Sequence, residues 1–341
     1  MNFDFNDDQH EIKRTAHDLL AARSTFERVR QAAESGAYDE RLWSELAGLG
    51  WAGIAVSEEH GGQGLGMVEL CVLLEELGYA VTATPLLPTA LAALAIQQAG
   101  SAEQQAAWLP RLASGGITGA LGVAQDGVTE LVADAGRASV IVLIEDDGAR
   151  LLTPEQATIE AVQSIDPTRH HARVSAPPDA GETLPGDVAG VLDHAAIAVS
   201  AELVGICQRG LDVSVAYAKD RKQFGTPVGA FQAVAHTCAQ MLRETESARS
   251  TTYYAAWAAD AEPALVPEAA ALAKAAASEA GRQVSASAIQ VHGGIGFTWE
   301  ADVHWLFKRA QMDAALFGSA GAHRKRLTAL VAGRLAGTFS A

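Results

Sequence analysis

The spacing of apolar residues in the first third of the chain predicts helices. Asn6 and Gln9 form a capping-box pattern, and the apolar residues that follow share one helix face: Ile12, Ala16, Leu19 and Leu20. A later helix is predicted from leucines at helical spacing and is expected to stop at Gly78: Leu70, Leu73, Leu74 and Leu77. The Gly-rich segment 61–66 between these helices is expected to be a loop.

The pattern changes in the middle of the chain. Val140 to Ile144 and Leu151 to Leu152 are short β-like runs, separated by the turn signal Asp146-Asp147-Gly148. Repeated prolines between residues 154 and 185 interrupt any helical pattern in this region. These features predict a small β-rich module.

Helical spacing returns after this module. One face is marked by Ile206, Gly210, Val213 and Tyr217, and another by Phe231, Val234, Cys238, Met241 and Thr245. The Ala- and Ser-rich segment 263–288 would let neighbouring helices approach closely. We therefore predict a mainly α chain with a small β module: helices over 1–116, a β-domain over 117–191 and helices over 192–341.

Composition and charge narrow the function. The 341 residues carry a net charge of −16, which argues against nucleic acid or an anionic membrane as partner. Three widely spaced cysteines indicate structural thiols in a reducing compartment rather than a disulfide framework. The acidic start lacks signal-peptide features, and no apolar run reaches the roughly 18 residues of a membrane span. We expect a cytoplasmic protein.

Several candidate chemistries are weakly supported. The Gly61–Gly66 segment matches neither a dinucleotide nor a phosphate-loop motif. His170 and His171 lie beside Asp166 and Arg169 without a second ligand pair at metal spacing, so solvated loop histidines and no metal site are expected. No serine-nucleophile motif is present.

Two segments have features of an anion-binding site. Arg221-Lys222-Gln223-Phe224-Gly225 follows a predicted helix, and Gln232 begins the next one. Arg221 could bind a phosphate bidentately, although a basic helix C-terminus has the same pattern. The second segment, Gln290 to Thr298, contains Gly293, Gly294 and Gly296, whose backbone N–H groups could approach an anion or simply form a helix C-cap.

Taken together, these segments resemble the acyl-CoA dehydrogenase family over nearly the whole chain. The N-terminal half contains the stretches Leu49–Val56, Glu58–Gly66, Glu75–Gly78 and Leu109–Gly115 in the family's order. The R-K-x-F-G segment at Arg221 and the Q-x-x-G-G-x-G-F segment at Gln290 resemble the family's C-terminal helical domain.

The resemblance implies a helical domain, a middle β-domain and a C-terminal four-helix bundle, assembled as tetramers. FAD then lies between subunits, and one subunit binds the ADP part of its neighbour's FAD. The positions that match those FAD contacts are Arg221, Gln223, Phe224, Gln232, Gln290, Gly293 and Gly294. The implied reaction is α,β-dehydrogenation of an acyl-CoA thioester, in which a glutamate removes the α-proton.

The base expected from this resemblance is missing. In the family it lies in an E-G-T turn, and counting 27 residues from Gln290 reaches Phe317. Some members place the base on an earlier helix, and the matching position here is Ala195. Ala196 follows where an arginine often contacts substrate. Glu202 is the nearest downstream carboxylate and only a weak substitute, so no catalytic residue is assigned.

The middle module also departs from the family. It is shorter than the roughly 100 residues usual there, and Gly122 to Gly127 replaces a flavin-binding T-E-x-x-x-G-S-D segment. No Trp occurs between Trp108 and Trp257, where the family has a W-I-[ST]-N strand. With these departures, the chain resembles the smaller subunit of actinobacterial α2β2 acyl-CoA dehydrogenases. Those enzymes act on CoA thioesters of steroid (cholesterol-type) side chains.

This resemblance implies a subunit that completes the FAD site of a full-length paralogue, which supplies the base and binds most of the acyl-CoA. An electron-transfer flavoprotein is the expected electron acceptor. Two alternatives remain open: a self-sufficient homo-oligomeric dehydrogenase that uses Glu202 as base, and a non-enzymatic pseudoenzyme that binds a partner without FAD.

Overall fold

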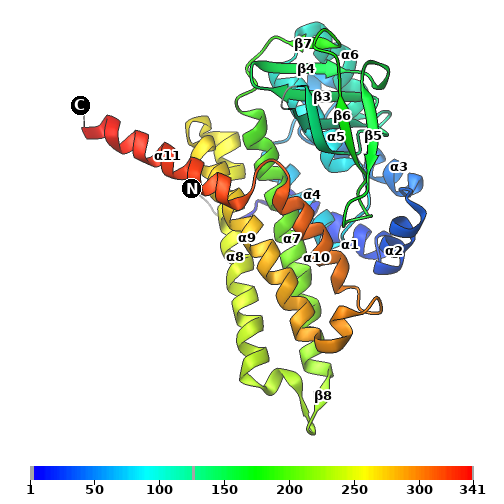
Figure 1. Cartoon of the computed structure of the whole chain (residues 1–341), viewed down its shortest axis with the longest axis vertical. Coiled ribbons are helices and arrows are strands. Elements are labelled where there is room, and N and C mark those ends of the chain that lie inside the picture. Colours follow the sequence, from blue (N-terminus) through cyan, green and yellow to red (C-terminus); the bar gives the residue numbers. More distant parts are fainter. Residues whose placement is uncertain (1–3, 125–126, 340–341) are drawn as a thin grey trace. The chain divides into compact units, whose positions relative to one another are not determined.

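The computed structural model describes residues 4–124 and 127–339, with the side chains of 336–339 left out. Its mainly helical fold with a small β module confirms the predicted fold class (Figure 1). Contacts between residues divide the chain into two compact units. One comprises residues 1–26, 71–82 and 196–341, and the other comprises 27–70 and 83–195. The predicted three-domain boundaries stay a prediction.

The N-terminal helices are α1 (Asp7–Arg23), α2 (Phe26–Ser35), α3 (Glu40–Gly48), α4 (Met67–Tyr79), α5 (Leu86–Ala99) and α6 (Ala102–Ala113). The capping box that starts α1 is present: the Asn6 side chain accepts from the Gln9 backbone N–H, and the Gln9 side chain accepts from the Asn6 N–H. Helix α5 is buried on nearly all sides and contacts β1 in its unit.

The β module forms two small sheets. The strands are β1 (Gly119–Val123), β2 (Val128–Ala133), β3 (Val140–Glu145), β4 (Gly148–Leu152), β5 (Thr158–Val162), β6 (His171–Ser175) and β7 (Glu182–Leu184). One sheet has the order β1-β3-β4-β7 and the other β2-β6-β5. Val132 and Val174 of the second sheet belong to one buried cluster with Ile141, Leu143 and Leu152 of the first. The predicted β runs are therefore correct.

The C-terminal helices are α7 (Val191–Asp220), α8 (Gln232–Ala261), α9 (Val266–His292), α10 (Val303–Ala315) and α11 (Ala320–Phe339). Helices α7 to α10 lie side by side in one unit (Figure 1). Helix α4 crosses α7 at very close range. A Cβ at Gly78 would lie 2.1 Å from the Glu202 carbonyl oxygen, and one at Gly205 would lie 1.8 Å from that of Glu75.

By length and composition, helix α7 is apolar enough to cross a membrane, although the sequence contains no uninterrupted apolar run of that length. However, 83% of its most apolar stretch is buried inside the protein. Burial of this kind is typical of a core helix, which must be apolar on most sides because other helices surround it.

Candidate functional site

The end of α7 is followed by a tight hairpin that the sequence did not predict. Strand β8 (Lys222–Gln223) pairs with β9 (Thr226–Pro227), with Gln223 opposite Thr226. The two loop residues, Phe224 and Gly225, have φ angles of 52° and 79°. Positive φ at both positions is typical of a type I′ turn, which matches the twist of the flanking strands. Arg221 therefore lies at the base of a rigid projection.

This hairpin presents its predicted site residues to solvent. Phe224 at the tip is 95% exposed, although it adopts a left-handed conformation that costs a non-glycine residue about 1–2 kcal/mol. Arg221, Gln223 and Gln232 are exposed as well, and Gln232 is the first residue of α8. An exposed aromatic on a strained, rigid turn is the kind of feature that another molecule covers.

The second predicted segment forms a turn at the end of α9. Gln290 is exposed in the last helical turn, and Gly293 follows with φ 65° and ψ −141°. No heavy atom lies within 4 Å of a Cβ built on Gly293 or Gly294, so the backbone there is open to a ligand. Phe297 and Trp299, just beyond, are 76% and 72% exposed.

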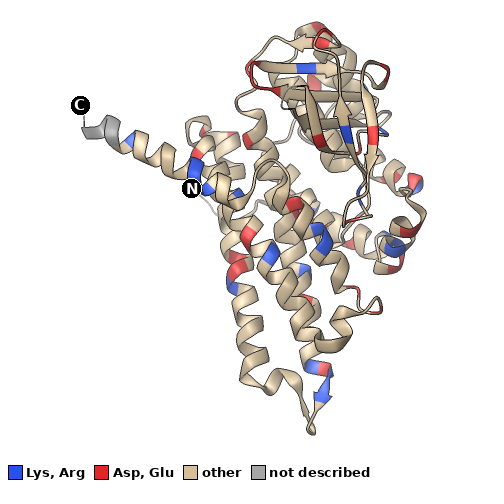
Figure 2. Cartoon of the chain, in the orientation of Figure 1, with Lys and Arg blue, Asp and Glu red and all other residues tan. Residues whose placement is uncertain are grey.

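A ring contact brings these two segments to the same end of the bundle. Tyr217, in the last turn of α7, stacks on His292, the last residue of α9, with ring centroids 4.4 Å apart. Figure 2 marks Lys and Arg positions in blue at the hairpin. Burial lowers the pKa of His292, while its hydrogen bond to the Ala288 carbonyl opposes that shift. The result is a cationic, open surface suited to an extended anion.

The sequence analysis named His292 and Phe297 only as members of the Gln290–Thr298 segment and did not assign Tyr217 or Trp299 to this surface. Exposed aromatic side chains such as Phe297 and Trp299 beside a glycine turn are a signal of a binding surface. Only the folded bundle shows that a residue of α7 and one of α9, 75 positions later, support one surface.

Phe317 occupies a well-supported turn. Helix α10 ends at Ala315, and Phe317 and Gly318 follow with φ angles of 54° and 103°. The Phe317 carbonyl is 2.9 Å from His323 Nε2. The turn thus has a defined conformation, but its side chain has no group that could take a proton.

Lys274 supports the helix end that precedes this turn. Its Nζ donates to the Ser278 hydroxyl and to the carbonyl oxygens of Asp313 and Ala314, at 2.8, 3.0 and 3.2 Å. Burial lowers the pKa of Lys274 to about 8, against the opposing effect of Asp313. Lys274 therefore satisfies carbonyl groups that α10 leaves without a helical partner.

The alternative base positions contain no available base. Ala195 and Ala196 are fully buried in α7. Glu202 is 2% exposed, and its Oε1 accepts a hydrogen bond of 2.7 Å from Arg309 Nη1, which is equally buried. A carboxylate held in a buried ion pair is poorly placed to accept a substrate proton, so this geometry argues against Glu202 as base.

The expectation that His170 and His171 are solvated is wrong. His171 begins β6 and is 4% exposed, while His170 stacks on Tyr38 with centroids 4.8 Å apart. Burial, followed by the nearby Arg137 charge, lowers the pKa of His170. The pairing of β6 with β2 and β5 accounts for the burial of His171, and the contact with Tyr38 covers His170, neither of which a local sequence pattern can reveal. Among the described residues, no group of three or more His, Cys, Asp or Glu could hold a metal.

The segment Gly122 to Gly127 stands where the resemblance places a flavin-binding segment. Two of its residues, Gln125 and Asp126, lie outside the described residues. Of the remainder, Gly122 and Val123 end β1 and Ala124 follows it, while Gly127 precedes β2 with a φ angle of 74°. Gly122 is packed closely, since a Cβ there would lie 2.8 Å from the Val132 side chain. This segment is therefore part of the packed module.

Comparison with known proteins identifies the fold. A subunit of the Tcur3481-Tcur3483 steroid ACAD (a variant protein) matches with a TM-score of 0.88 and 29% identity, over 97% of this chain and 99% of that one. The ChsE4-ChsE5 complex from Mycobacterium tuberculosis matches with a TM-score of 0.88 and 25% identity, over 97% and 99%. The fold is that of the acyl-CoA dehydrogenases.

Sequence comparison gives the family. Residues 6–116 match the family model "Acyl-CoA dehydrogenase, N-terminal domain", and residues 187–331 match "Acyl-CoA dehydrogenase, C-terminal domain". The chain is 38% identical over 322 residues to the acyl-CoA dehydrogenase IpdE2 of Mycolicibacterium smegmatis, over 94% of this chain and 97% of the relative. The chain belongs to the acyl-CoA dehydrogenase family.

Proposed function

We propose that this chain is the non-catalytic subunit of a heteromeric, FAD-dependent acyl-CoA dehydrogenase and completes the FAD site of a full-length paralogue. One observation carries the proposal. Phe317 stands in the turn where the family's base is expected, while the hairpin and the glycine turn remain open at one end of the bundle. The chain keeps surfaces for binding a cofactor and lacks the group that starts the reaction.

The residues at this end of the bundle fit the ADP part of FAD. Arg221 offers a forked cation for a pyrophosphate, and the amides of Gly293 and Gly294 can approach it without steric hindrance. Gln223, Gln232 and Gln290 are exposed and can donate or accept hydrogen bonds. Phe224 is positioned to cover an aromatic ring. A bound FAD would supply the acceptor for the hydride that leaves the acyl β-carbon.

The proton step must then belong to the partner. Removing the α-proton of a thioester needs a base within hydrogen-bond reach of it. Phe317, Ala195 and Ala196 cannot accept a proton, and Glu202 is engaged by Arg309. We infer that a glutamate of the paralogue takes this proton and that the paralogue binds most of the acyl-CoA.

The names of the structural neighbours support a paralogous partner. One is a steroid ACAD named for two proteins, and the other is a complex of two differently named chains. We propose an α2β2 heterotetramer that acts on the CoA thioester of a steroid side chain in the cytoplasm. Electron transfer to an electron-transfer flavoprotein is part of the same proposal.

Flavin content and mass of the purified protein test this proposal. The chain is expressed alone and together with a full-length paralogue, and absorbance near 450 nm is read for each. We expect flavin only in the mixed complex, with one FAD for each pair of unlike subunits. One FAD per chain in a homo-oligomer would instead establish the self-sufficient enzyme.

A matched pair of variants separates flavin binding from assembly. Arg221→Ala should lower the flavin content of the mixed complex, because it removes a charge-assisted contact worth about 1.5–3 kcal/mol. Arg243→Ala is the control, since Arg243 is an exposed residue of α8 that contacts Glu244. Unchanged flavin content in Arg221→Ala would favour the pseudoenzyme that does not touch FAD.

A further inference from the structure

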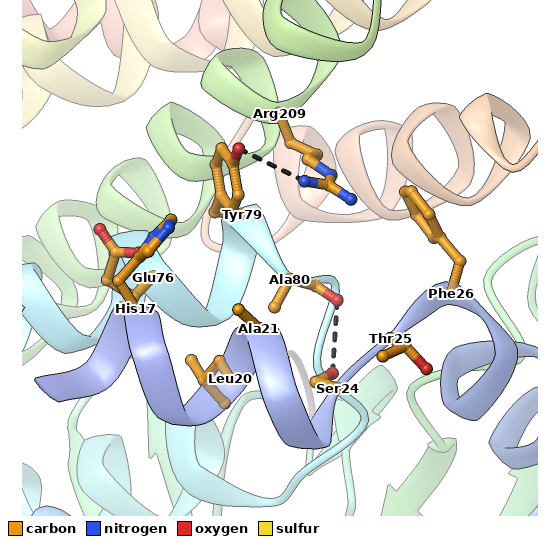
Figure 3. A pocket seen from close by; sticks show the side chains of 10 residues that line it. All are labelled: His17, Leu20, Ala21, Ser24, Thr25, Phe26, Glu76, Tyr79, Ala80 and Arg209. Carbon is orange, nitrogen blue, oxygen red and sulfur yellow. Dashed lines mark hydrogen bonds and ion pairs between the residues drawn. The ribbon is translucent and has the colours of Figure 1, made fainter. Parts of the chain in front are cut away.

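A pocket apart from the hairpin end of the bundle is lined by α1, the start of α2, the end of α4 and α7 (Figure 3). All of its lining residues belong to one compact unit. The volume of the pocket is about 290 Å³. Leu20, Ala21 and Ala80 give it an apolar wall, while Glu76, Tyr79 and Arg209 supply polar groups. The proposed function uses none of these residues.

Arg209 is held between two aromatic rings at this pocket. Its guanidinium carbon lies 5.0 Å from the ring centroid of Phe26 and 5.0 Å from that of Tyr79. Figure 3 shows the side chain between the two rings. Aromatic contacts cover the faces of a planar guanidinium and fix its orientation, so that only its edges remain for hydrogen bonds.

The Arg209 guanidinium makes a hydrogen bond through Nη1, whereas its Nε has no hydrogen-bond partner among the described residues. Nη1 donates to the Tyr79 hydroxyl at 3.3 Å, and that hydroxyl donates to Asp212 at 3.0 Å. The Nε atom is buried and has no acceptor among the described residues. A buried donor of a charged group without a partner is costly, so an acceptor from outside the chain would stabilise it.

The neighbouring carboxylates are already engaged. Glu76 accepts from Lys13 at 3.0 Å and lies 2.9 Å from His17 Nδ1. Asp212 also accepts from Gln208 at 2.9 Å. Lys13 offsets the charge of Glu76, and Tyr79 and Gln208 donate hydrogen bonds to Asp212, so neither carboxylate occupies the Nε edge of Arg209.

We propose that this pocket binds a small monocarboxylate with a short apolar tail. The carboxylate would accept from Nε and Nη2 of Arg209, the edge whose two parallel N–H groups match a carboxylate. The tail would pack against Leu20, Ala21 and Ala80. The volume lies at the lower end of the roughly 300–1,000 Å³ usual for ligand pockets and suits a ligand of this size.

Isothermal titration with matched probes tests the ligand class. Hexanoate, hexanamide and inorganic phosphate are titrated into the full-length chain in the assembly in which it purifies. We expect one hexanoate per chain and about tenfold weaker binding of hexanamide, which lacks the charge. Equal binding of hexanamide, tighter binding of phosphate, or no heat with hexanoate would overturn the proposal.

Three variants test the location. Arg209→Gln should weaken hexanoate binding at least about tenfold. Because this change can also disturb the aromatic contacts, Ala21→Phe offers a second test: Ala21 is an exposed pocket residue, and a larger side chain there narrows the pocket while leaving Arg209 intact. Arg243→Gln is the surface control. Unchanged binding in Ala21→Phe, or equal loss in Arg243→Gln, would place hexanoate elsewhere and refute the site.

Discussion

Glu202 and Arg309 join α7 to α10 through an ion pair in the core, with side chains only 2% and 1% exposed. Removing one partner of such a pair leaves the other charge buried and uncompensated. We therefore expect Glu202→Gln to lower the free energy of unfolding by about 3–5 kcal/mol, measured by denaturant titration. Turnover per folded mixed complex should stay unchanged.

The double variant Glu202→Leu/Arg309→Met is the control for this prediction. Replacing both charges by apolar groups of similar volume removes the desolvation cost together with the attraction, so most of the lost stability should return. If Glu202→Gln were fully stable and yet abolished turnover, Glu202 would be the base after all.

Lys274 gives the chain a pH dependence of known sign. Its ordinary pKa of 10.5 applies in the unfolded chain, whereas burial lowers it to about 8 in the folded chain. Between these values the unfolded chain binds a proton that the folded chain does not, so the Lys274 contribution to stability rises with pH. Below about pH 8 both states are protonated, and the cost of burying the charge is complete.

A comparison with Lys274→Met measures this effect, since other titrating groups cancel in the difference. From about pH 8 to pH 10.5, the unfolding free energy of the wild type should rise relative to the variant by about 3 kcal/mol. Denaturant titrations of both proteins across this range check it. A constant difference between them would mean that Lys274 stays charged when folded.

At the scale of single residues, the sequence revealed what is missing better than what is paired. Phe317 and Ala195 could be recognised by counting from motifs. The partner of Glu202 could not, because Arg309 is 107 positions away and only the packing of α10 on α7 brings the two together. The buried state of His171 depends in the same way on strand pairing.

At the scale of elements, the crossing of α4 and α7 depends on two glycines. Gly78 was expected to stop its helix, but α4 continues to Tyr79, and the missing side chain instead lets α7 approach. Gly78→Ala and Gly205→Ala should each destabilise the chain by more than about 3 kcal/mol, because the Cβ would overlap a carbonyl oxygen of the other helix.

Gly333→Ala provides the matched control in a thermal unfolding experiment. Gly333 lies in α11 with no heavy atom within 4 Å of a built Cβ, so alanine there should stabilise by about 0.5–1 kcal/mol. A mild effect of Gly205→Ala, similar in size to that of the control, would show that the two helices do not pack at this distance.

Local sequence patterns predicted whether a segment is a helix or a strand, but they did not predict every turn that ends one. The α1 capping box and the β3–β4 hairpin depend on neighbouring residues, so the sequence predicted them correctly. The β8–β9 hairpin was missed, since Phe224 at a positive-φ position departs from the Asn-Gly preference of such turns.

At the scale of the whole molecule, Phe224 should lower the stability of the single chain while it helps the assembled complex to retain flavin. Phe224→Gly relieves the left-handed strain, so the chain alone should gain about 1 kcal/mol in unfolding free energy. The mixed complex should retain less flavin, because the 95%-exposed ring is then absent from the proposed FAD contact. Calorimetry of the single chain and absorbance of the complex measure the two effects. A variant that gained stability and kept all its flavin would remove Phe224 from the site.

The sequence by itself determined the fold class and the family, and it predicted that no base stands at the positions that the resemblance assigns to one. These features are written in local periodicity and in motifs whose residues lie close together along the chain. The tertiary structure decided which charges are paired, which histidines are buried, and that the ends of α7 and α9 form one open surface. It also created the Arg209 pocket from three distant segments. Such contacts join residues far apart in sequence, and only the packing of the helices fixes them.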